Sequence, residues 1–236
     1  MTTLAGIHPV IEALRAGQSL ERVLIAKGAG GERVQQIVEL CRANAVPVRF
    51  ETRNALDRLS RTAAHQGVVA IAAAHTYHNL EDVLAGAKLL VMLDGVEDPH
   101  NLGAIIRTAH AAGADAVCIP ERRSAPLSDV AAKAAAGALA HLPVVKTGNL
   151  NQTIDLLKQR GYWIYGLDER GNHDYDQVQL THPAAIILGG EGQGLHRHTA
   201  GRCDYLVRIP LAGRISSLNV SVAAGIVLFE WKRRAA

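Results

Sequence analysis

Short apolar runs recur along this sequence, and a segment with helical spacing follows most of them. In the larger part of the chain the runs lie at 89–93, 116–119, 143–145, 163–167, 185–188 and 206–209, separated by helical patterns at about 101–113, 129–140, 151–160 and 217–233. Runs that are apolar at every position are typical of strands buried on both faces, and strands joined through helices form a parallel sheet. The sequence therefore predicts an α/β fold with a mostly parallel sheet, which binds ligands at the carboxyl ends of its strands.

The first 76 residues show the same alternation on a smaller scale. Apolar runs at 22–26, 46–50 and 67–72 alternate with helical patterns at 8–16, 32–43 and 54–59. Pro47 lacks the N–H that a central strand donates, so we expect the strand at 46–50 near a sheet edge. The sequence predicts a small α/β domain over residues 1–76, a linker over 77–87 and a larger α/β domain over 88–236.

Composition excludes several classes of protein. The 236 residues are 48% hydrophobic and 20% charged, which is incompatible with a disordered chain. No apolar stretch approaches the ~20 residues that cross a bilayer, and the N-terminal segment lacks the pattern of a secretion signal. Cys41, Cys118 and Cys203 have no metal-ligand spacing and are typical of buried thiols. We therefore expect a cytoplasmic protein with no membrane partner and no bound metal.

Charge is unevenly distributed along the chain. Lys and Arg number 25 against 22 Asp and Glu, a net charge of +3. Residues 1–76 hold nine of the basic side chains and six of the acidic ones, so the whole excess of three lies in the first domain. This positive excess would suit binding of a polyanion, although ordinary solvent-exposed surfaces also carry an excess of this size.

Unusual residues form a first group after the strand at 89–93, and this group reads Asp94-Gly-Val-Glu-Asp-Pro-His-Asn-Leu-Gly-Ala-Ile-Ile-Arg-Thr-Ala109. We expect Asn101 to cap the helix that follows. Arg107 interrupts an otherwise apolar stretch. Its guanidinium must therefore extend to solvent, in a surface salt bridge, or meet an anion in a cleft.

A second group, Leu188-Gly-Gly-Glu-Gly-Gln-Gly-Leu195, follows a buried strand. Its four glycines allow the backbone to turn sharply or to approach a ligand closely. The group matches neither the phosphate loop nor the dinucleotide fingerprint. A tight turn explains the glycines but not Glu191, whose carboxylate falls at a strand end where a functional group is expected.

The third group, Ser217-Leu-Asn-Val-Ser-Val-Ala223, opens the final helix. We expect Ser217 to cap this helix, which places Asn219 in its first turn. The helix is apolar on nearly all sides and is therefore expected to be buried. Asn219 must then be paired, either with the protein or with a ligand.

Together and in this order, the three groups resemble the signature motifs of the SpoU (TrmH-like) branch of the SPOUT RNA methyltransferases. The first 76 residues look like the small L30e-type α/β domain that binds the RNA substrate in one subgroup, through Gly6-Ile-His-Pro-Val10 and His65-Gln-Gly-Val-Val69. This pair of domains is similar to that of bacterial enzymes that methylate a guanosine ribose 2′-hydroxyl in 23S ribosomal RNA.

The resemblance implies a SPOUT domain with a deep trefoil knot and a homodimer through the knot region. It also implies S-adenosyl-L-methionine as the cofactor. Carried over to this sequence, the residues that would bind the cofactor, largely through backbone groups, are Leu188, Gly189, Gly194, Ile209, Pro210 and Leu218.

Catalytic residues are implied in the same way. Arg107 would act on the ribose hydroxyl, and the residues that would position ribose, phosphate and Arg107 are Asn101, Glu191, Ser217 and Asn219. An arginine is normally protonated. Arg107 therefore serves as a base only after losing its proton, and otherwise stabilises the developing alkoxide. Both roles stay open.

These motifs describe the reaction rather than the target. The leading hypothesis is 2′-O-ribose methylation of a guanosine in 23S ribosomal RNA, either free or in an assembling ribosomal particle, and a transfer RNA substrate is the alternative. A non-catalytic RNA-binding assembly factor belongs to another class. Degenerate motifs would indicate it, whereas Arg107, Glu191 and Asn219 are all present.

Overall fold

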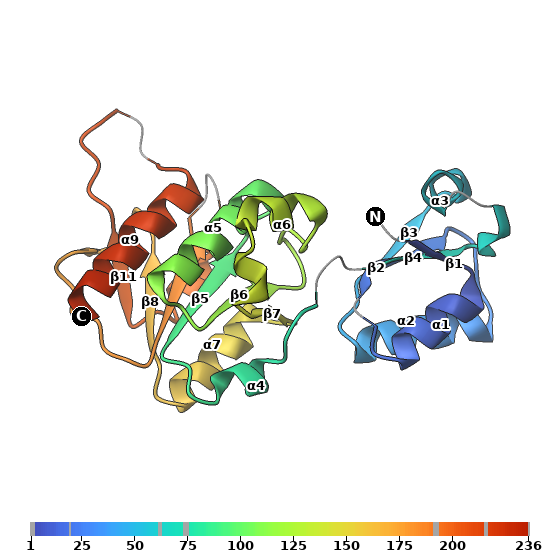
Figure 1. Ribbon diagram of the computed structural model, residues 1–236, viewed down its shortest axis with the longest axis horizontal. Helices are drawn as coiled ribbons and strands as arrows, with labels where there is room; N and C mark the ends of the chain where they lie inside the picture. Colours follow the sequence, from blue (N-terminus) through green and yellow to red (C-terminus); the bar gives the residue numbers. More distant parts are fainter. Residues whose placement is uncertain are drawn as a thin grey trace. The chain divides into compact units, whose positions relative to one another are not determined.

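The computed structural model describes residues 3–18, 20–60, 63–72, 76–190, 194–214 and 217–235. The chain divides into two compact units (Figure 1), the first including residues 1–76 and the second most of residues 77–236. Each unit is an α/β structure built on one sheet. None of the described helices is long and apolar enough to span a membrane.

The first unit has a four-stranded sheet in the order β1–β4–β2–β3. Its strands are β1 (Thr3–Ala5), β2 (Leu20–Ala26), β3 (Val48–Glu51) and β4 (Val68–Ala72), and its helices are α1 (Ile7–Arg15), α2 (Glu32–Ala43) and α3 (Arg53–Ser60), with a 3-10 turn at Ala63–His65. α1 and α2 pack on one face of the sheet and α3 on the other. β3 lies at the edge, as Pro47 predicts.

His65 explains one of the short motifs in this unit. Its side chain is fully buried, with Nε2 2.8 Å from a carboxylate oxygen of Asp57. Its Nδ1 accepts a hydrogen bond from the amide of Gly67 at 3.0 Å. The imidazole therefore ties the turn before β4 to helix α3.

In the second unit a seven-stranded sheet has the order β7–β6–β5–β10–β8–β11–β9, with every neighbouring pair parallel. The strands are β5 (Leu89–Asp94), β6 (Ala116–Pro120), β7 (Val144–Thr147), β8 (Trp163–Leu167), β9 (His173–Asp174), β10 (Ala184–Gly189) and β11 (Tyr205–Arg208). The helices are α4 (Leu80–Leu84), α5 (Pro99–Ala112), α6 (Asp129–Ala135), α7 (Leu150–Gln159), α8 (Arg197–Ala200) and α9 (Val220–Ala235). The predicted parallel α/β architecture is confirmed.

Helices cover both faces of this sheet. Leu90 and Met92 of β5 belong to a buried cluster with apolar residues of α7 and α4. Neighbouring residues of a strand point to opposite faces, so Leu89, Val91 and Leu93 face the other side. There α5 and α9 pack along each other (Figure 1). Burial on both faces is why the strands read as unbroken apolar runs.

Several local expectations differ from the structure. α6 ends at Ala135 because Ala136 and Gly137 have positive φ angles of 48° and 89°, so only a 3-10 turn at Ala138–Ala140 follows instead of a helix to residue 140. The expected linker over 77–87 contains α4 and lies in the second compact unit. The expected knot loops include residues 191–193 and 215–216, which lie outside the described residues, and the knot stays a prediction.

The cysteine expectation holds for two of the three thiols. Cys41 and Cys118 are buried, and burial raises the pKa of Cys41 to about 11 and that of Cys118 to about 12. Cys203 is only partly buried, because it lies in the segment between α8 and β11 rather than in a strand.

Candidate active site

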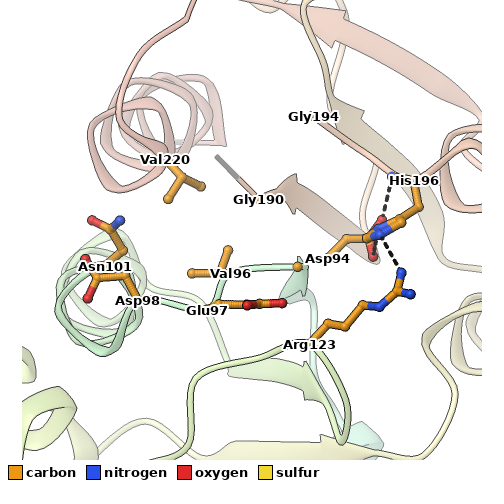
Figure 2. Close-up of a pocket in the computed structure, with 11 residues that line it drawn as sticks. Asp94, Val96, Glu97, Asp98, Asn101, Arg123, Gly190, Gly194, His196 and Val220 are labelled. Carbon is orange, nitrogen blue, oxygen red and sulfur yellow. Dashed lines mark hydrogen bonds and ion pairs between the residues drawn. The ribbon is translucent and has the colours of Figure 1, made fainter. Parts of the chain in front are cut away.

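Two hollows adjoin each other at the carboxyl ends of the central strands. The glycine crevice, of about 270 Å³, is lined by Leu167, Asp168, Glu169, Leu188, Gly189, Gly190, Gly194, Ile209, Leu211, Ser217, Leu218, Val220 and Ala223. The polar cavity (Figure 2), of about 550 Å³, is lined by Asp94, Gly95, Val96, Glu97, Asp98, Asn101, Arg123, Gly190, Gly194, His196 and Val220. They share Gly190, Gly194 and Val220, so ligands bound in the two hollows would meet at this wall.

Backbone packing requires glycine in the second motif. A Cβ added to Gly189 would lie 2.3 Å from the carbonyl carbon of Gly194, and one added to Gly190 would lie 2.2 Å from the carbonyl oxygen of Gly95. Gly194 has a φ of +63° and forms an antiparallel bridge with Gly190. The segment therefore folds back on itself against the end of β5, at distances that no side chain permits.

Asp168 fixes the far end of this glycine segment. It follows β8, is only 4% exposed, and accepts hydrogen bonds from the Leu195 amide at 2.9 Å and from Arg170 Nε and Nη2, both at 2.7 Å. Arg170 also donates to the carbonyl of Leu195 at 2.9 Å. Burial alone would raise the pKa of Asp168, but the hydrogen bonds from Arg170 and Leu195 outweigh it and keep that pKa below its ordinary value.

A chain of three side chains forms one end of the polar cavity. A carboxylate oxygen of Asp94 lies 2.9 Å from Nδ1 of His196, and its other oxygen accepts from the His196 amide at 2.9 Å. Nη1 of Arg123 lies 3.4 Å from Nε2 of the same ring (Figure 2). Asp94 was part of the first motif, whereas Arg123 and His196 were not singled out from the sequence.

α5 begins earlier than its sequence suggested. Pro99 occupies its first position, where a missing N–H costs nothing, and Asp98 is the N-cap, accepting from the His100 amide at 2.9 Å. The expectation that Asn101 caps the helix is therefore wrong. Asn101 lies buried in the first turn, where its Oδ1 accepts from Nδ2 of Asn219 at 3.0 Å.

At the start of α9 the cap is Asn219 rather than Ser217. The helix starts at Val220, and Oδ1 of Asn219 accepts from the amides of Ser221 at 2.9 Å and Val222 at 3.4 Å. Ser217 lies two residues before the cap, exposed, in the lining of the glycine crevice. Asn219 thus caps α9 and bonds to α5 with the same side chain.

The remaining predicted residues lie in different places. The predicted cofactor residues that line the glycine crevice are Leu188, Gly189, Gly194, Ile209 and Leu218. Pro210 is exposed and is not among the described lining residues. Arg107 is exposed on α5, about 9 Å along the helix axis from Asn101, and is not among the described residues that line either hollow. Glu191 lies outside the described residues.

Asp168 and Arg123 also follow strands, β8 and β6, so the rule that functional groups lie at carboxyl ends of parallel strands could have marked them. Among the residues that the structure describes, no group of three or more His, Cys, Asp or Glu side chains is arranged to hold a metal ion.

A parallel sheet with a backbone-lined crevice beside a polar cavity is suited to an enzyme that brings two substrates together. Residues 88–229 match the SpoU rRNA methylase family, and residues 3–78 match the RNA 2′-O ribose methyltransferase substrate-binding family. The chain belongs to the SpoU rRNA methylase family and is an RNA methyltransferase, which confirms the resemblance of its three motifs.

Individual relatives agree with this assignment. A Staphylococcus epidermidis protein named for the TrmH family of tRNA/rRNA methyltransferases is 39% identical over 237 residues, covering 98% of this chain and 95% of that protein. The AdoMet-bound rRNA methyltransferase from Sinorhizobium meliloti has 30% identity and a TM-score of 0.64, covering 99% of this chain and 87% of its own. The A. aeolicus TrmH/SpoU tRNA modifying enzyme has 30% identity and a TM-score of 0.57, covering 62% of this chain and 74% of its own.

Proposed function

We propose that this methyltransferase modifies the ribose 2′-oxygen of a guanosine in 23S ribosomal RNA, with S-adenosyl-L-methionine as the methyl donor. The observation that carries the proposal is the wall shared by the two hollows. A donor in the glycine crevice and a ribose in the polar cavity would meet at Gly190, Gly194 and Val220.

The glycine crevice fits such a donor. Apolar side chains in its lining suit an adenine ring, and these are Leu167, Leu188, Ile209, Leu211 and Leu218. The carboxylate of Glu169 suits the positive charge of the ammonium group or of the sulfonium. The bound cofactor would supply a methyl group on a positively charged sulfur, for which the leaving group is a neutral thioether. The family relative from Sinorhizobium meliloti is an AdoMet-bound protein.

Side chains of this protein would position the ribose and its oxygen. The bonded pair Asn101 and Asn219 fixes the starts of α5 and α9 beside the shared wall. Ser217, in the crevice lining, and Glu191, outside the described residues, belong to the same proposed set. Arg107 would stabilise the negative charge that develops on the 2′-oxygen, because a preorganised guanidinium lowers the energy of that charge.

A homodimer would bring Arg107 and α9 into one interface. Val222 and Phe229 of α9 are 51% and 48% exposed, and Leu218, just before this helix, is 39% exposed, an unusual concentration of apolar surface. Arg107 is adjacent in sequence to Thr108, which lies beside Gly225 of α9. We propose that a second copy covers this side of α9.

Ribosomal RNA is favoured over transfer RNA by the extent of the similarity. The Sinorhizobium meliloti rRNA methyltransferase covers 99% of this chain, whereas the A. aeolicus tRNA modifying enzyme covers 62%. Residues 3–78 match a substrate-binding family of their own. The exposed basic side chains of this first unit include Lys27, Arg33 and Arg53, which would bind the RNA phosphates.

The test is to incubate the protein with methyl-tritiated S-adenosyl-L-methionine and total RNA from cells that lack it. We expect one guanosine of 23S ribosomal RNA to acquire a methyl group that makes the adjacent linkage resistant to alkali. Incorporation into transfer RNA would favour the alternative substrate. A methyl group on a base, or no incorporation into either RNA, would refute the proposal.

A further inference from the structure

We propose that Arg123, oriented by His196 and Asp94, binds the RNA phosphate that adjoins the target ribose. This inference rests on the proposed function, because it assigns one end of the polar cavity to the substrate backbone. It names a phosphate-binding residue outside the three motifs.

The lining of the polar cavity carries both signs of charge. Three carboxylates line it, those of Asp94, Glu97 and Asp98, and a phosphate near them alone would be repelled. Asp98 and Asn101 lie on one side of the cavity, and Arg123 and His196 lie on the other, where the carboxylate of Asp94 is already bonded to His196 (Figure 2). In an RNA chain the ribose is flanked by two phosphates, one on its 5′ side and one on its 3′ side. Electrostatics therefore favours placing one of these phosphates beside Arg123 rather than beside Asp98, which leaves the 2′-hydroxyl toward Asn101.

His196 is held in one orientation. Asp94, only 7% exposed, contacts both the backbone amide and Nδ1 of His196, at 2.9 Å each. With Nδ1 donating to this carboxylate, Nε2 accepts from Nη1 of Arg123. That contact uses one of five guanidinium N–H groups, and the planar fork of an arginine matches two oxygens of a phosphate.

The backbone at Arg123 also directs its side chain to the cavity. Arg123 has a φ of +56°, a left-handed conformation that non-glycine residues rarely adopt. The loop is fixed on both sides, because the Glu121 amide donates to the carbonyl of Thr147 at 2.9 Å and the Ala125 amide donates to that of Val96 at 2.8 Å. Val96 is itself part of the cavity lining. Such conformations persist where the surrounding structure requires them, often at ligand sites.

A purely structural role explains less. Asp94 already ties β5 to the start of α8 through the amide and ring of His196. The Arg123 contact, at 3.4 Å and exposed, is long for a hydrogen bond and adds little to that tie. A guanidinium that is aimed into a cavity but weakly bound there can transfer to a ligand at low cost.

The experiment compares Arg123→Gln, Arg123→Lys and the neighbouring control Arg122→Gln, because Arg122 is exposed and is not among the described lining residues. Substrates are an unmodified 23S ribosomal RNA transcript and a mixture of transfer RNA transcripts. On whichever RNA accepts methyl groups, we expect Arg123→Gln to raise KM about tenfold or more, with the affinity for S-adenosyl-L-methionine unchanged. Arg123→Lys should recover part of the loss, and Arg122→Gln should change KM less than about twofold.

Two further measurements separate phosphate binding from structure. The slope of log affinity against log salt should fall by about one in Arg123→Gln, and by less in the control Arg122→Gln. His196→Ala should raise KM less than Arg123→Gln, and the double variant should be no worse than Arg123→Gln alone, because His196 acts through Arg123. Equal KM and salt slope in Arg123→Gln and the unaltered protein would overturn the inference.

Failure of the proposed function gives a different result. If the unaltered protein methylates neither RNA, the proposed function fails. The phosphate site is then judged by binding of the 23S transcript, where equal affinity of Arg123→Gln and Arg122→Gln would reject it and a specific loss in Arg123→Gln would support it.

Discussion

Arg107 faces solvent from the outer side of α5, within a helix whose other face is buried against the sheet and α9. It is not among the described residues that line the glycine crevice, so its loss is expected to leave cofactor binding intact. We predict that Arg107→Ala lowers kcat at least about a hundredfold, the usual effect of losing a group that stabilises a developing oxyanion.

The same variant should keep its affinity for S-adenosyl-L-methionine, measured by isothermal titration, and its free energy of unfolding within about 0.5 kcal/mol. Arg107→Lys retains the positive charge but lacks the planar guanidinium, so its turnover shows which of the two the reaction requires. Undiminished turnover in Arg107→Ala would remove the residue from the mechanism, and lost cofactor binding would move it into the binding site.

Asp168 is the second residue whose environment makes a quantitative prediction. In Asp168→Asn an amide replaces one acceptor oxygen among N–H donors from Leu195 and Arg170. We expect the free energy of unfolding to fall by about 1–3 kcal/mol, as for other buried groups that lose a charged partner. Cofactor affinity should fall as well, because Leu195 ends the glycine segment. Glu169→Gln, an exposed neighbour, is the control for stability.

The effect of Asp168 should depend on pH in one direction. Its pKa is lower in the folded protein than its ordinary value of 3.8, so its stabilisation is fully present above that pH and is lost as the pH falls through the folded value. Urea unfolding between pH 3 and pH 7 should show a constant difference between Asp168→Asn and the unaltered protein at neutral pH. The difference should narrow below pH 3.8. A gap that persists unchanged into acid would show that the carboxylate charge is not the cause.

At the scale of elements, α5 and α9 are joined at their first turns by Asn219. Asn219→Ala removes both the cap of α9 and the bond to Asn101, whereas Asn219→Ser retains a capping oxygen but cannot reach Asn101. We predict that Asn219→Ala is less stable than Asn219→Ser by about 1 kcal/mol, the usual value of an N-cap. Thermal unfolding measures this, and equal melting temperatures would show that the cap contributes nothing.

Strands of the second unit were predictable because burial on both faces leaves a continuous apolar signal. β5, β6, β8 and β10 match their predicted runs to within a residue. β1 and β9 were missed because three and two residues are too few to show a pattern. Helix starts shifted where two capping residues competed, as Asp98 with Asn101 and Asn219 with Ser217.

The site was predictable only where residues follow one another in the sequence. Glycines after a buried strand signalled a backbone crevice, and the topology of a parallel sheet placed that crevice at the strand ends. His196 meets Asp94 across 102 residues of sequence and Arg123 across 73. No local spacing encodes such contacts, because the sheet order β6–β5–β10 creates them.

For the whole molecule, the apolar side of α9 decides whether the protein acts alone or as a pair. Phe229→Glu places a charge in the proposed interface, where burying it without a partner would cost more than the contact provides. We predict that this variant is monomeric in sedimentation equilibrium while the unaltered protein is dimeric. Phe50→Glu is the matched control, since Phe50 is equally exposed in the first unit and should leave the dimer intact.

Methyl transfer should follow the oligomeric state in this variant. Helices α5 and α9 run parallel to each other, with contacts between Asn101 and Asn219, Thr108 and Gly225, and Ala111 and Lys232. Along this pair of helices, the exposed Arg107 and Phe229 both lie between the levels of Asn219 and Lys232. If a second copy covers this side, loss of the dimer removes the surroundings of the Arg107 guanidinium and lowers kcat, while cofactor affinity in the glycine crevice changes little. A monomeric Phe229→Glu that turns over at the normal rate would show that one chain completes the site. A dimeric Phe229→Glu would instead exclude this side of α9 as the interface, and Arg107 would then have to reach the ribose within its own chain.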